Sequence, residues 1–489
     1  MTVRTRLAPS PTGYLHIGNL RTALYNYLLA RKFHGQFILR IEDTDQARFV
    51  DGAIESLLKT FTTIGLDHDE GPYLEEGNIV QKGDYGPYIQ SERLELYRKY
   101  ADQLVRDGKA YYCFCSKERI EEVRKQQEIA KLQPKYDRHC LTLSTQEVQA
   151  KLDGGEPFVI RMKIPEGETV FTDAIRGSIS INHAEIDDQV IMKSDGFPTY
   201  HLAVVVDDHL MNISHIIRGE EWLSSVPKHI LLYNYFGWEI PIFAHLPLIL
   251  NQDRSKLSKR QGDVAVEDYL AKGYLPEALI NFIALLGFNP KGDQEIYPLQ
   301  ELIDSFELSK VNKSGAVFDH QKLDWMNGQY IKQLTNEELV IRCKTFLEKA
   351  EMEIDTVLFE KICFVEKDRL TRLDEIVDHC HFYLTPSKYE TDLLIWKKAD
   401  KQDALSQLQQ ISLFIEELKE NIFDSLELIE SSIKRYIEER DFQNGNVLWP
   451  LRVALSGKSS SPSPFELMWI FGKKHSLDRI QEAIIKLTL

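Results

Sequence analysis

The feature that most constrains the fold is a strand–loop–helix–strand pattern at the start of the chain. The residues predict a short strand over 3–7, a turn-rich loop over 9–13, a helix that begins near Gly18 and stops at Gly35, and a strand over 37–41. Two parallel strands joined by a helix form the βαβ unit, which builds sheets covered by helices. The chain therefore begins with an α/β element.

The same pattern returns far along the chain. Strands are expected over 215–218 and 245–250, with a helix over 227–236 between them. The segment from about 91 to 194 alternates charged helical stretches with short strands, and beyond about 320 almost every segment has helical spacing. In that last region Thr335 to Glu338 is a capping-box sequence, which predicts the start of a helix, and 458–464 is expected to be a loop between two helices. The sequence predicts an α/β core, in which an α+β insertion splits a Rossmann-like parallel sheet, followed by an all-α C-terminal half.

The composition is that of an ordinary globular protein, and it limits the cellular compartments in which the protein is expected. No stretch has the apolar length that a membrane helix needs, and the first residues lack the apolar region of a signal peptide. Six cysteines in 489 residues do not form a secreted disulfide framework. We expect a cytoplasmic protein that makes no contact with a membrane.

The net charge bears on nucleic-acid binding. The chain carries a formal charge of −16 at pH 7. Counterion release favours basic proteins, so this charge argues against general, sequence-independent binding of nucleic acid. A specific RNA partner held by local basic patches is still compatible with it.

The loop between the first strand and helix contains Pro9 to Gly13 and then His16 and Gly18. A nucleotide phosphate can meet a helix N-terminus there, and small residues let the backbone approach a ligand. The imidazole of His16 could stabilise charge on a phosphoryl group. Taken alone, these residues more often form a simple tight turn.

A second basic element follows the strand at 245–250. Lys256 and Lys259, with Arg260, suit a polyphosphate on which charge builds up during transfer. Such a loop alone is usually an ordinary basic surface loop. Two such elements in this order around a split parallel sheet indicate binding of a nucleotide phosphate much more specifically than either element alone.

At these two elements the chain resembles class I aminoacyl-tRNA synthetases, and more closely the bacterial-type glutamyl-tRNA synthetases. The matching stretches are 4–24, Arg40 to Asp45, 195–202, 217–222, 256–262 and 318–331, which includes Lys322 to Asn327. The resemblance spans most of the chain and is weakest after about residue 340.

The resemblance implies ATP-dependent ligation of L-glutamate to the 3′ end of tRNA(Glu) through a glutamyl-adenylate, with Mg²⁺ accompanying ATP. It leaves open whether tRNA(Gln) is charged as well. The sequence leaves the oligomeric state open too, and a monomer is the default expectation. By the same resemblance, His16, Lys256 and Lys259 are catalytic. The implied ATP-binding residues are Thr12, His16, Gly18, Glu221, Trp222, Lys256 and Lys259.

Selection of glutamate requires groups that recognise its carboxylates and its ammonium, and the resemblance indicates which residues these are. An arginine fork binds a carboxylate through two parallel bonds, and a carboxylate can face the substrate ammonium. The implied glutamate-binding residues are Arg6, Ser10, Glu42, Tyr200 and Arg218. One departure is Val204, where some relatives have an asparagine in the pocket; valine cannot form a hydrogen bond, so another group or water must take that role.

A cysteine cluster in the insertion suggests a structural zinc ion, because thiolates are good zinc ligands. The proposed ligands are Cys113, Cys115, Cys140 and Tyr136. Many relatives place a histidine two residues after the third cysteine, where this chain has Thr142. The fourth ligand is therefore open between Tyr136, His139 and water, and three small buried residues without a metal remain the alternative.

The resemblance also implies a division into domains. These are a catalytic domain at 1–90 and 195–250, an inserted domain at 91–194 that binds the tRNA acceptor end, a stem-contact domain at 251–320 with the lysine-rich loop, and helical anticodon-binding domains at 321–375 and 376–489.

Three alternatives share parts of these patterns. A glutaminyl-tRNA synthetase has a β-rich C-terminal half, which the helical spacing here disfavours. A truncated paralogue that glutamylates a tRNA nucleoside lacks the C-terminal half. A non-catalytic tRNA-binding relative would not need His16, Lys256 and Lys259.

Overall fold

The structure is a computed structural model that describes residues 2–257, 264–290, 292–385, 387–397 and 399–489. The chain divides into two compact units. The first unit comprises Met1–Ala271 and Pro276–Leu323, and the second comprises Lys272–Leu275 and Asp324–Leu489.

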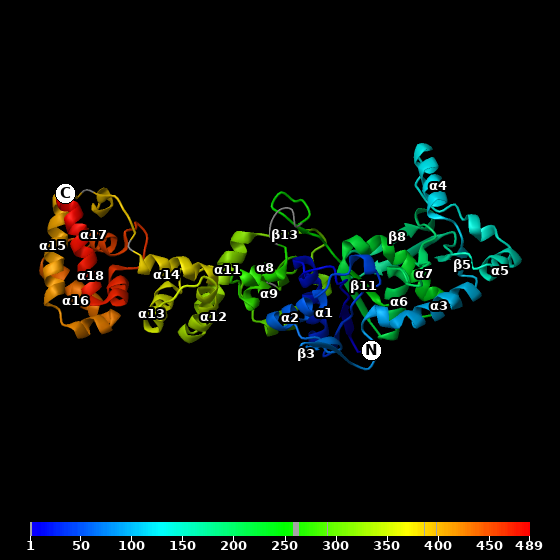
Figure 1. The fold of residues 1–489 in the computed structure, drawn as a ribbon, viewed down its shortest axis with the longest axis horizontal. Helices are drawn as coiled ribbons and strands as arrows, with labels where there is room; N and C mark the ends of the chain where they lie inside the picture. Colours follow the sequence, from blue (N-terminus) through cyan, green and yellow to red (C-terminus); the bar gives the residue numbers. More distant parts are fainter. Residues whose placement is uncertain (1, 258–263, 291, 386, 398) are drawn as a thin grey trace. The chain divides into compact units, whose positions relative to one another are not determined.

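A parallel sheet forms the centre of the first unit (Figure 1). β1 (Arg4–Leu7) pairs in parallel with β2 (Gln36–Leu39), and β10 (His215–Gly219) pairs in parallel with β11 (Ile242–Leu246). The N–H of Ser214 donates to the carbonyl oxygen of Arg4 at 3.0 Å, which places β1 beside β10. The two βαβ units predicted from the sequence thus meet in one layer.

Each parallel pair is connected by a helix. α1 (Ile17–Lys32) joins β1 to β2, and α7 (Val226–Phe236) joins β10 to β11. Leu20, Leu24 and Leu28 of α1 lie at helical spacing and are fully buried. Such apolar stripes hold the helices against the sheet.

The inserted segment takes part in the core sheet, which the sequence did not reveal. β7 (Glu168–Asp173) lies between β11 and β8 (Gly177–Asn182) in the order β10-β11-β7-β8. The other strands of the insertion are β5 (Ala110–Cys113), β6 (Val159–Met162) and β9 (Val190–Met192). One continuous apolar cluster packs residues of the insertion, such as Ile160 and Met162, with Val205 and Ile216 of the core.

The strand predicted over 245–250 is wrong in its bounds. β11 ends at Leu246, and a separate strand, β12 (Ile249–Leu250), pairs in parallel with β13 (Ala316–Val317). Pro247 lies at the break. Proline has no N–H to donate to a ladder, so the chain leaves the first sheet there.

The remaining elements of the first unit surround this framework. They are α2 (Ala53–Ile64), β3 (Gly71–Glu75), β4 (Asn78–Lys82), α3 (Leu94–Arg106), α4 (Lys117–Ile129), α5 (Thr145–Asp153), α6 (Tyr200–Leu210), α8 (Val266–Ala271), α9 (Pro276–Ala284) and α10 (Leu299–Ser305). α4 has no buried residue and projects from the insertion (Figure 1).

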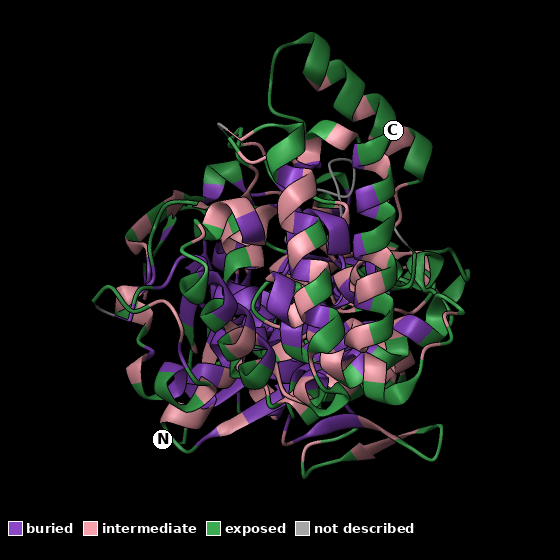
Figure 2. Cartoon of the chain, turned by 90° about the vertical axis from the view of Figure 1, so that its left-hand side faces the viewer, coloured by how far each residue is buried: buried purple, intermediate pink, exposed green. Residues whose placement is uncertain are grey.

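The second unit contains helices and no strand among its described residues. α11 (His320–Gln333) begins in the first unit, and the helices that follow are α12 (Asn336–Lys349), α13 (Thr356–Glu366), α14 (Ile376–Leu384), α15 (Lys401–Glu417), α16 (Leu426–Glu439), α17 (Asn444–Ser456) and α18 (Pro464–Thr488). Figure 2 shows helices with a buried stripe and an exposed face. In α16 the buried residues Ile429, Ile433 and Ile437 produce that stripe.

Local signals in the second unit are confirmed. Thr335 and Glu338 form the predicted capping box at the start of α12, each side chain bonding the other residue's backbone N–H. The loop around 458–464 lies between α17 and α18 as expected.

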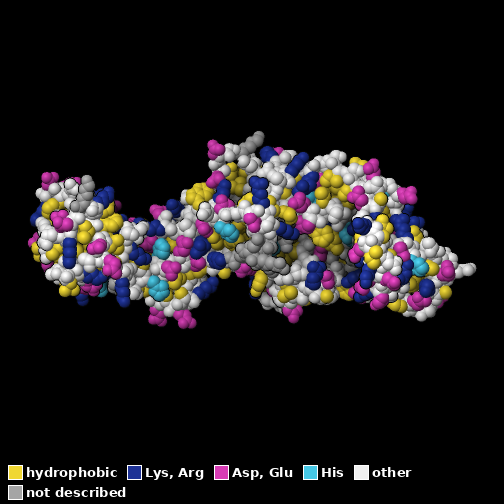
Figure 3. Space-filling view, turned by 90° about the horizontal axis from the view of Figure 1, so that it is seen from above, with side chains coloured by type: hydrophobic (Ala, Val, Ile, Leu, Met, Phe, Trp, Pro, Cys, Tyr) yellow, Lys and Arg dark blue, Asp and Glu magenta, His cyan; other side chains and the backbone are white. Residues whose placement is uncertain are grey.

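Two surface properties bear on partners. Of the helices in the described ranges, none has the length and apolar character needed to cross a bilayer. On the face that Figure 3 shows, basic and acidic side chains are interspersed.

Candidate active site

The predicted ATP and glutamate residues that the structure describes all line one cavity of about 810 Å³ in the first unit. These residues are Arg6, Ser10, Thr12, His16, Gly18, Glu42, Tyr200, Arg218, Glu221, Trp222 and Lys256. Lys259 lies outside the described residues. The cavity opens at the carboxyl ends of β1 and β10, the edge where parallel sheets bind ligands.

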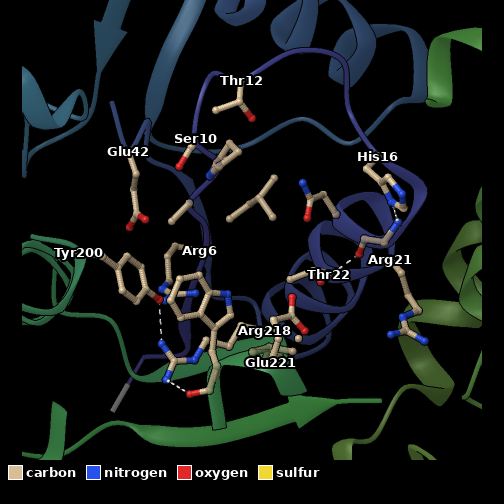
Figure 4. Close-up of a pocket in the computed structure, with 18 of the residues that line it drawn as sticks. Arg6, Ser10, Thr12, His16, Arg21, Thr22, Glu42, Tyr200, Arg218 and Glu221 are labelled. Carbon is tan, nitrogen blue, oxygen red and sulfur yellow. Dashed lines mark hydrogen bonds between the residues drawn. The ribbon is translucent and has the colours of Figure 1, made fainter. Parts of the chain in front are cut away.

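The cavity has two chemically different sides (Figure 4). His16 and Thr22 lie on one side with α1, whereas Glu42, Tyr200, Arg6 and Arg218 gather on the other. The first side offers a helix N-terminus, and the second offers charged side chains.

His16 is the N-cap residue of α1. Its Nδ1 accepts a hydrogen bond from the backbone N–H of Gly18 at 2.9 Å. Because Nδ1 is the acceptor, the neutral ring carries its proton on Nε2. The side chain therefore completes the helix N-terminus and also provides a donor beside the positive end of the helix dipole, an arrangement suited to a phosphate.

On the other side, Arg218 and Tyr200 are in direct contact. The guanidinium Nη1 of Arg218 donates to the Tyr200 hydroxyl at 2.8 Å, and the rings of Tyr200 and Trp222 lie 4.1 Å apart. Burial raises the pKa of Tyr200. The hydroxyl accepts from Arg218, so its own proton remains to be donated to another group.

A buried ion network supports this side of the cavity. Arg40 is fully buried and donates to Asp208 at 2.7 Å and to Glu42 at 3.0 Å. Asp208 also accepts from Nε of Arg6 at 3.1 Å. Burial alone would raise the pKa of Asp208, but Arg6 and Arg40 hold that pKa below its ordinary value. The network fixes Arg6 and Glu42, because buried charges are held by paired groups.

Sequence reasoning missed the supporting members of this network. Arg40 stands in an apolar strand pattern, and Asp208 follows the buried apolar run Leu202–Val206 of α6. A charged residue within such a run was the available signal, because charged side chains are rarely fully buried unless they are paired.

Arg218 differs from Arg6 in its partners. Among the described residues its hydrogen bonds go to Nε2 of His245 at 3.1 Å, the Tyr200 hydroxyl, the carbonyl oxygen of Trp222 at 3.4 Å and Nδ1 of His229 at 3.4 Å. Burial lowers the pKa of His229 and His245, so these partners are neutral. Arg218 is 5% exposed, and its direct partners among the described residues are all uncharged.

Val204 does not take part in the cavity. It is 1% exposed in α6 and packs in the main apolar cluster of the first unit. The cavity lining does not include it. Val204 therefore offers no hydrogen bond to the cavity, whereas the hydroxyl of Tyr200 lies in its lining.

The cysteines of the insertion come together as the spacing suggested. The sulfurs of Cys113, Cys115 and Cys140 lie within 4.8 Å of one another, with 3.5 Å between the last two. The hydroxyl of Tyr136 is 3.3 Å from the Cys113 sulfur and 3.4 Å from that of Cys115. His139 is exposed and is not part of the cluster. The Tyr136 hydroxyl thus lies beside two of the sulfurs, and Nη1 of Arg119 donates to the Cys115 sulfur at 3.4 Å.

Comparisons with known proteins agree with this architecture. Residues 2–325 match the family described as tRNA synthetases class I (E and Q), catalytic domain, and residues 330–484 match an anticodon binding domain. A glutamate–tRNA ligase of Clostridioides difficile is 46% identical over 98% of each chain. One of Chloroherpeton thalassium is 49% identical over 99% of this chain and 98% of its own.

A solved structure gives the same picture. The crystal structure of a glutamate tRNA ligase from Elizabethkingia meningosepticum in complex with its amino acid covers 100% of both chains, with a TM-score of 0.88 and 36% identity. The chain thus belongs to the class I aminoacyl-tRNA synthetases for glutamate and glutamine. Within that class it belongs to the glutamate–tRNA ligases.

Proposed function

We propose that this chain activates L-glutamate with ATP and Mg²⁺ in the cavity described above and then transfers it to the 3′ end of tRNA(Glu). Family membership supports the overall reaction. The carboxylate of glutamate attacks the α-phosphate of ATP, which releases pyrophosphate, and the terminal ribose of the tRNA then attacks the activated carbonyl. Little covalent chemistry falls to protein groups, so positioning and electrostatics account for most of the acceleration.

The observation that supports the proposal most strongly is the charge balance on the side of the cavity that contains Arg6, Glu42 and Arg218, which we call the amino-acid side. Arg6 is paired with Asp208, and Arg40 with Glu42, whereas Arg218 keeps a buried positive charge with neutral partners. A buried charge without a partner is costly, so the site favours an anion. Free glutamate carries a net charge of −1 and glutamine carries none, which gives a physical basis for selection.

The remaining roles follow from position. Arg6 and Arg218 bind the two carboxylates, Glu42 binds the ammonium, and Ser10 and Tyr200 add hydrogen bonds. On the nucleotide side, the proposed ATP contacts are Thr12, His16, Gly18, Glu221, Trp222 and Lys256, together with Lys259 beyond the described residues.

An exchange and charging assay tests the proposal. We expect isotope exchange between pyrophosphate and ATP to require L-glutamate, and to require tRNA because a bound acceptor end completes the ATP site. Glutamine should not replace glutamate. Exchange without any RNA would contradict the tRNA requirement, and exchange with glutamine alone would contradict the amino-acid assignment. Charging of purified tRNA(Glu) and tRNA(Gln) in parallel measures whether the second tRNA is also a substrate.

The helical second unit argues against the glutaminyl alternative. Its described residues contain no strand, whereas the glutaminyl relatives carry a β-rich half. We assign anticodon binding to 321–375 and 376–489 and acceptor-end binding to 91–194, in a cytoplasmic monomer. The match of residues 330–484 to an anticodon binding domain supports the first assignment.

We also propose a structural zinc ion at the cysteine cluster. A tetrahedral site with zinc–sulfur bonds of about 2.3 Å separates its sulfurs by roughly 3.8 Å. The 3.5 Å between Cys115 and Cys140 is close to that value, and the adjacent Tyr136 hydroxyl provides a fourth donor. The three thiols and this phenol therefore fit the ion, which would hold the insertion together.

Metal analysis tests the zinc site. Protein purified without chelator should contain about one zinc per chain, because closed four-ligand sites bind tightly. Cys113→Ser should lose the metal, and Cys343→Ser, at a buried cysteine of the second unit, is the matched control that should keep it. Unchanged zinc content in the first variant would contradict the proposed ligands.

A further inference from the structure

We infer that Asp173 and His245 are positioning residues that aim the Arg218 guanidinium at the substrate carboxylate while leaving its positive charge unneutralised. The inference rests on the proposed role of Arg218 in glutamate binding. It assigns a task to two residues that do not line the cavity.

The three side chains form a buried chain of hydrogen bonds. Nε of Arg218 donates to Nε2 of His245 at 3.1 Å, and Nδ1 of His245 lies 2.7 Å from a carboxylate oxygen of Asp173. Asp173 is 1% exposed, His245 is 0% exposed and Arg218 is 5% exposed. Arg218 and His245 are cross-strand partners in the β10–β11 ladder, which places their side chains on the same face of the sheet.

The donors and acceptors fix the tautomer of His245. Nε of Arg218 always carries a proton, so Nε2 of His245 must be the acceptor and Nδ1 must carry the ring proton. The Nδ1–H then donates to Asp173. Burial lowers the pKa of His245, which keeps the ring neutral, although the hydrogen bond to Asp173 opposes that effect.

Asp173 is itself locked by the backbone around it. Its Oδ1 accepts N–H groups of Ile175 at 3.0 Å, Arg176 at 2.9 Å and His245 at 3.3 Å. Only Oδ2 is left for the imidazole. An acceptor therefore faces Nδ1 of His245 in a fixed direction.

The neutral ring between the two charges has a functional consequence. Asp208 contacts Arg6 directly and neutralises it, but no carboxylate contacts Arg218 among the residues that the structure describes. An imidazole transmits orientation through directional hydrogen bonds while it keeps the Asp173 charge at a distance. Coulomb attraction falls with separation, so Arg218 retains more attraction for the carboxylate of the substrate.

The geometry also ties the insertion to the amino-acid pocket. Asp173 is the last residue of β7, within the predicted insertion, and β7 pairs with β11 at Asp173 and Phe243. The orientation of Arg218 on β10 therefore depends on a residue of the inserted segment.

A double-mutant cycle tests the inference. In Asp173→Asn the side-chain oxygen keeps the three backbone N–H groups, so the amide NH₂ faces Nδ1 of His245. The ring must then carry its proton on Nε2, which opposes the Nε–H of Arg218. We expect the KM for glutamate to rise roughly tenfold or more, the effect of losing one charge-assisted hydrogen bond, while the KM for ATP stays within about twofold.

His245→Gln is the rescuing variant, because its amide oxygen can accept from Arg218 near the position of Nε2. This acceptor is present whether residue 173 is aspartate or asparagine. H245Q should stay close to wild type, H245A should resemble D173N, and D173N should add little in the H245Q background. Discrimination between glutamate and glutamine should follow the same order, and melting temperatures report folding.

Four outcomes separate the possible failures. If D173N costs the same with and without H245Q, Asp173 acts through the fold, and the inference is wrong. If H245Q is as impaired as H245A, the acceptor at Nε2 has no role, which also overturns it. If Arg218→Ala changes only the KM for ATP, the proposed role of Arg218 itself fails; a glutamate defect in R218A with a normal D173N overturns the inference alone.

Discussion

Arg218→Ala is expected to raise the KM for glutamate by roughly 100-fold or more, because it removes two charge-assisted hydrogen bonds, each of which contributes about 1.5–3 kcal/mol. On the amino-acid side of the cavity, the buried guanidinium of Arg218 has uncharged direct partners among the described residues, so its loss also removes the preference for a net negative amino acid. Preference for glutamate over glutamine should fall with it. Pyrophosphate exchange in the presence of tRNA, with either amino acid varied, measures both effects.

Arg218→Lys is the matched control. Lysine keeps the charge but loses the planar fork and the Nε–H that bonds His245. It should retain part of the preference for glutamate while its KM remains raised. If both variants change the KM for ATP and leave the KM for glutamate unchanged, Arg218 belongs to the nucleotide side of the cavity.

The elements with strong local patterns could be predicted from the sequence. The helix expected near Gly18 begins at Ile17, and the capping box at Thr335 forms as expected. Helical periodicity and helix capping are local properties, so both can be recognised within a single segment of the sequence. The strand break at Pro247 is also marked by a local signal, the proline itself. The prediction of one strand over 245–250 did not take that proline into account.

Pairings between distant segments could not be predicted in the same way. The insertion was expected as a separate body, yet β7 joins the core sheet beside β11. That pairing depends on tertiary packing, which periodicity does not encode. The described residues that the resemblance named line one cavity, but the pattern of each segment gave no partner for Arg40 or for Arg218.

The supporting residues were missed for a physical reason. Asp173 and His245 are 72 positions apart, and Arg40 and Asp208 are 168 apart. Each is an ordinary polar residue within its own segment, and only its burial and its partner give it a role. A buried charge in an apolar run is a signal that something must pair with it, but it does not say what.

The second large effect is expected at His16. Its Nδ1 caps α1, and its Nε2–H can stabilise charge that develops on the α-phosphate. One imidazole ring therefore serves both as a helix cap and as a donor to the phosphate. His16→Asn should separate them, because the amide oxygen can still accept from the N–H of Gly18, and asparagine is a favoured N-cap residue. Adenylate formation should slow by roughly 100-fold or more, as when one preorganised donor is lost, with little change in melting temperature.

Two further variants complete the argument. His16→Gln places a donor near the position of Nε2 but loses the cap, so it should be less stable, by about 0.5–2 kcal/mol, and faster than H16N. His16→Ala loses both groups and should be impaired in both measurements. Single-turnover rates of adenylate formation, set beside thermal melting, distinguish the roles. If H16N forms adenylate at the wild-type rate, the ring serves only as a helix cap, and the charge on the phosphate must be stabilised by α1 and the lysines of the second loop.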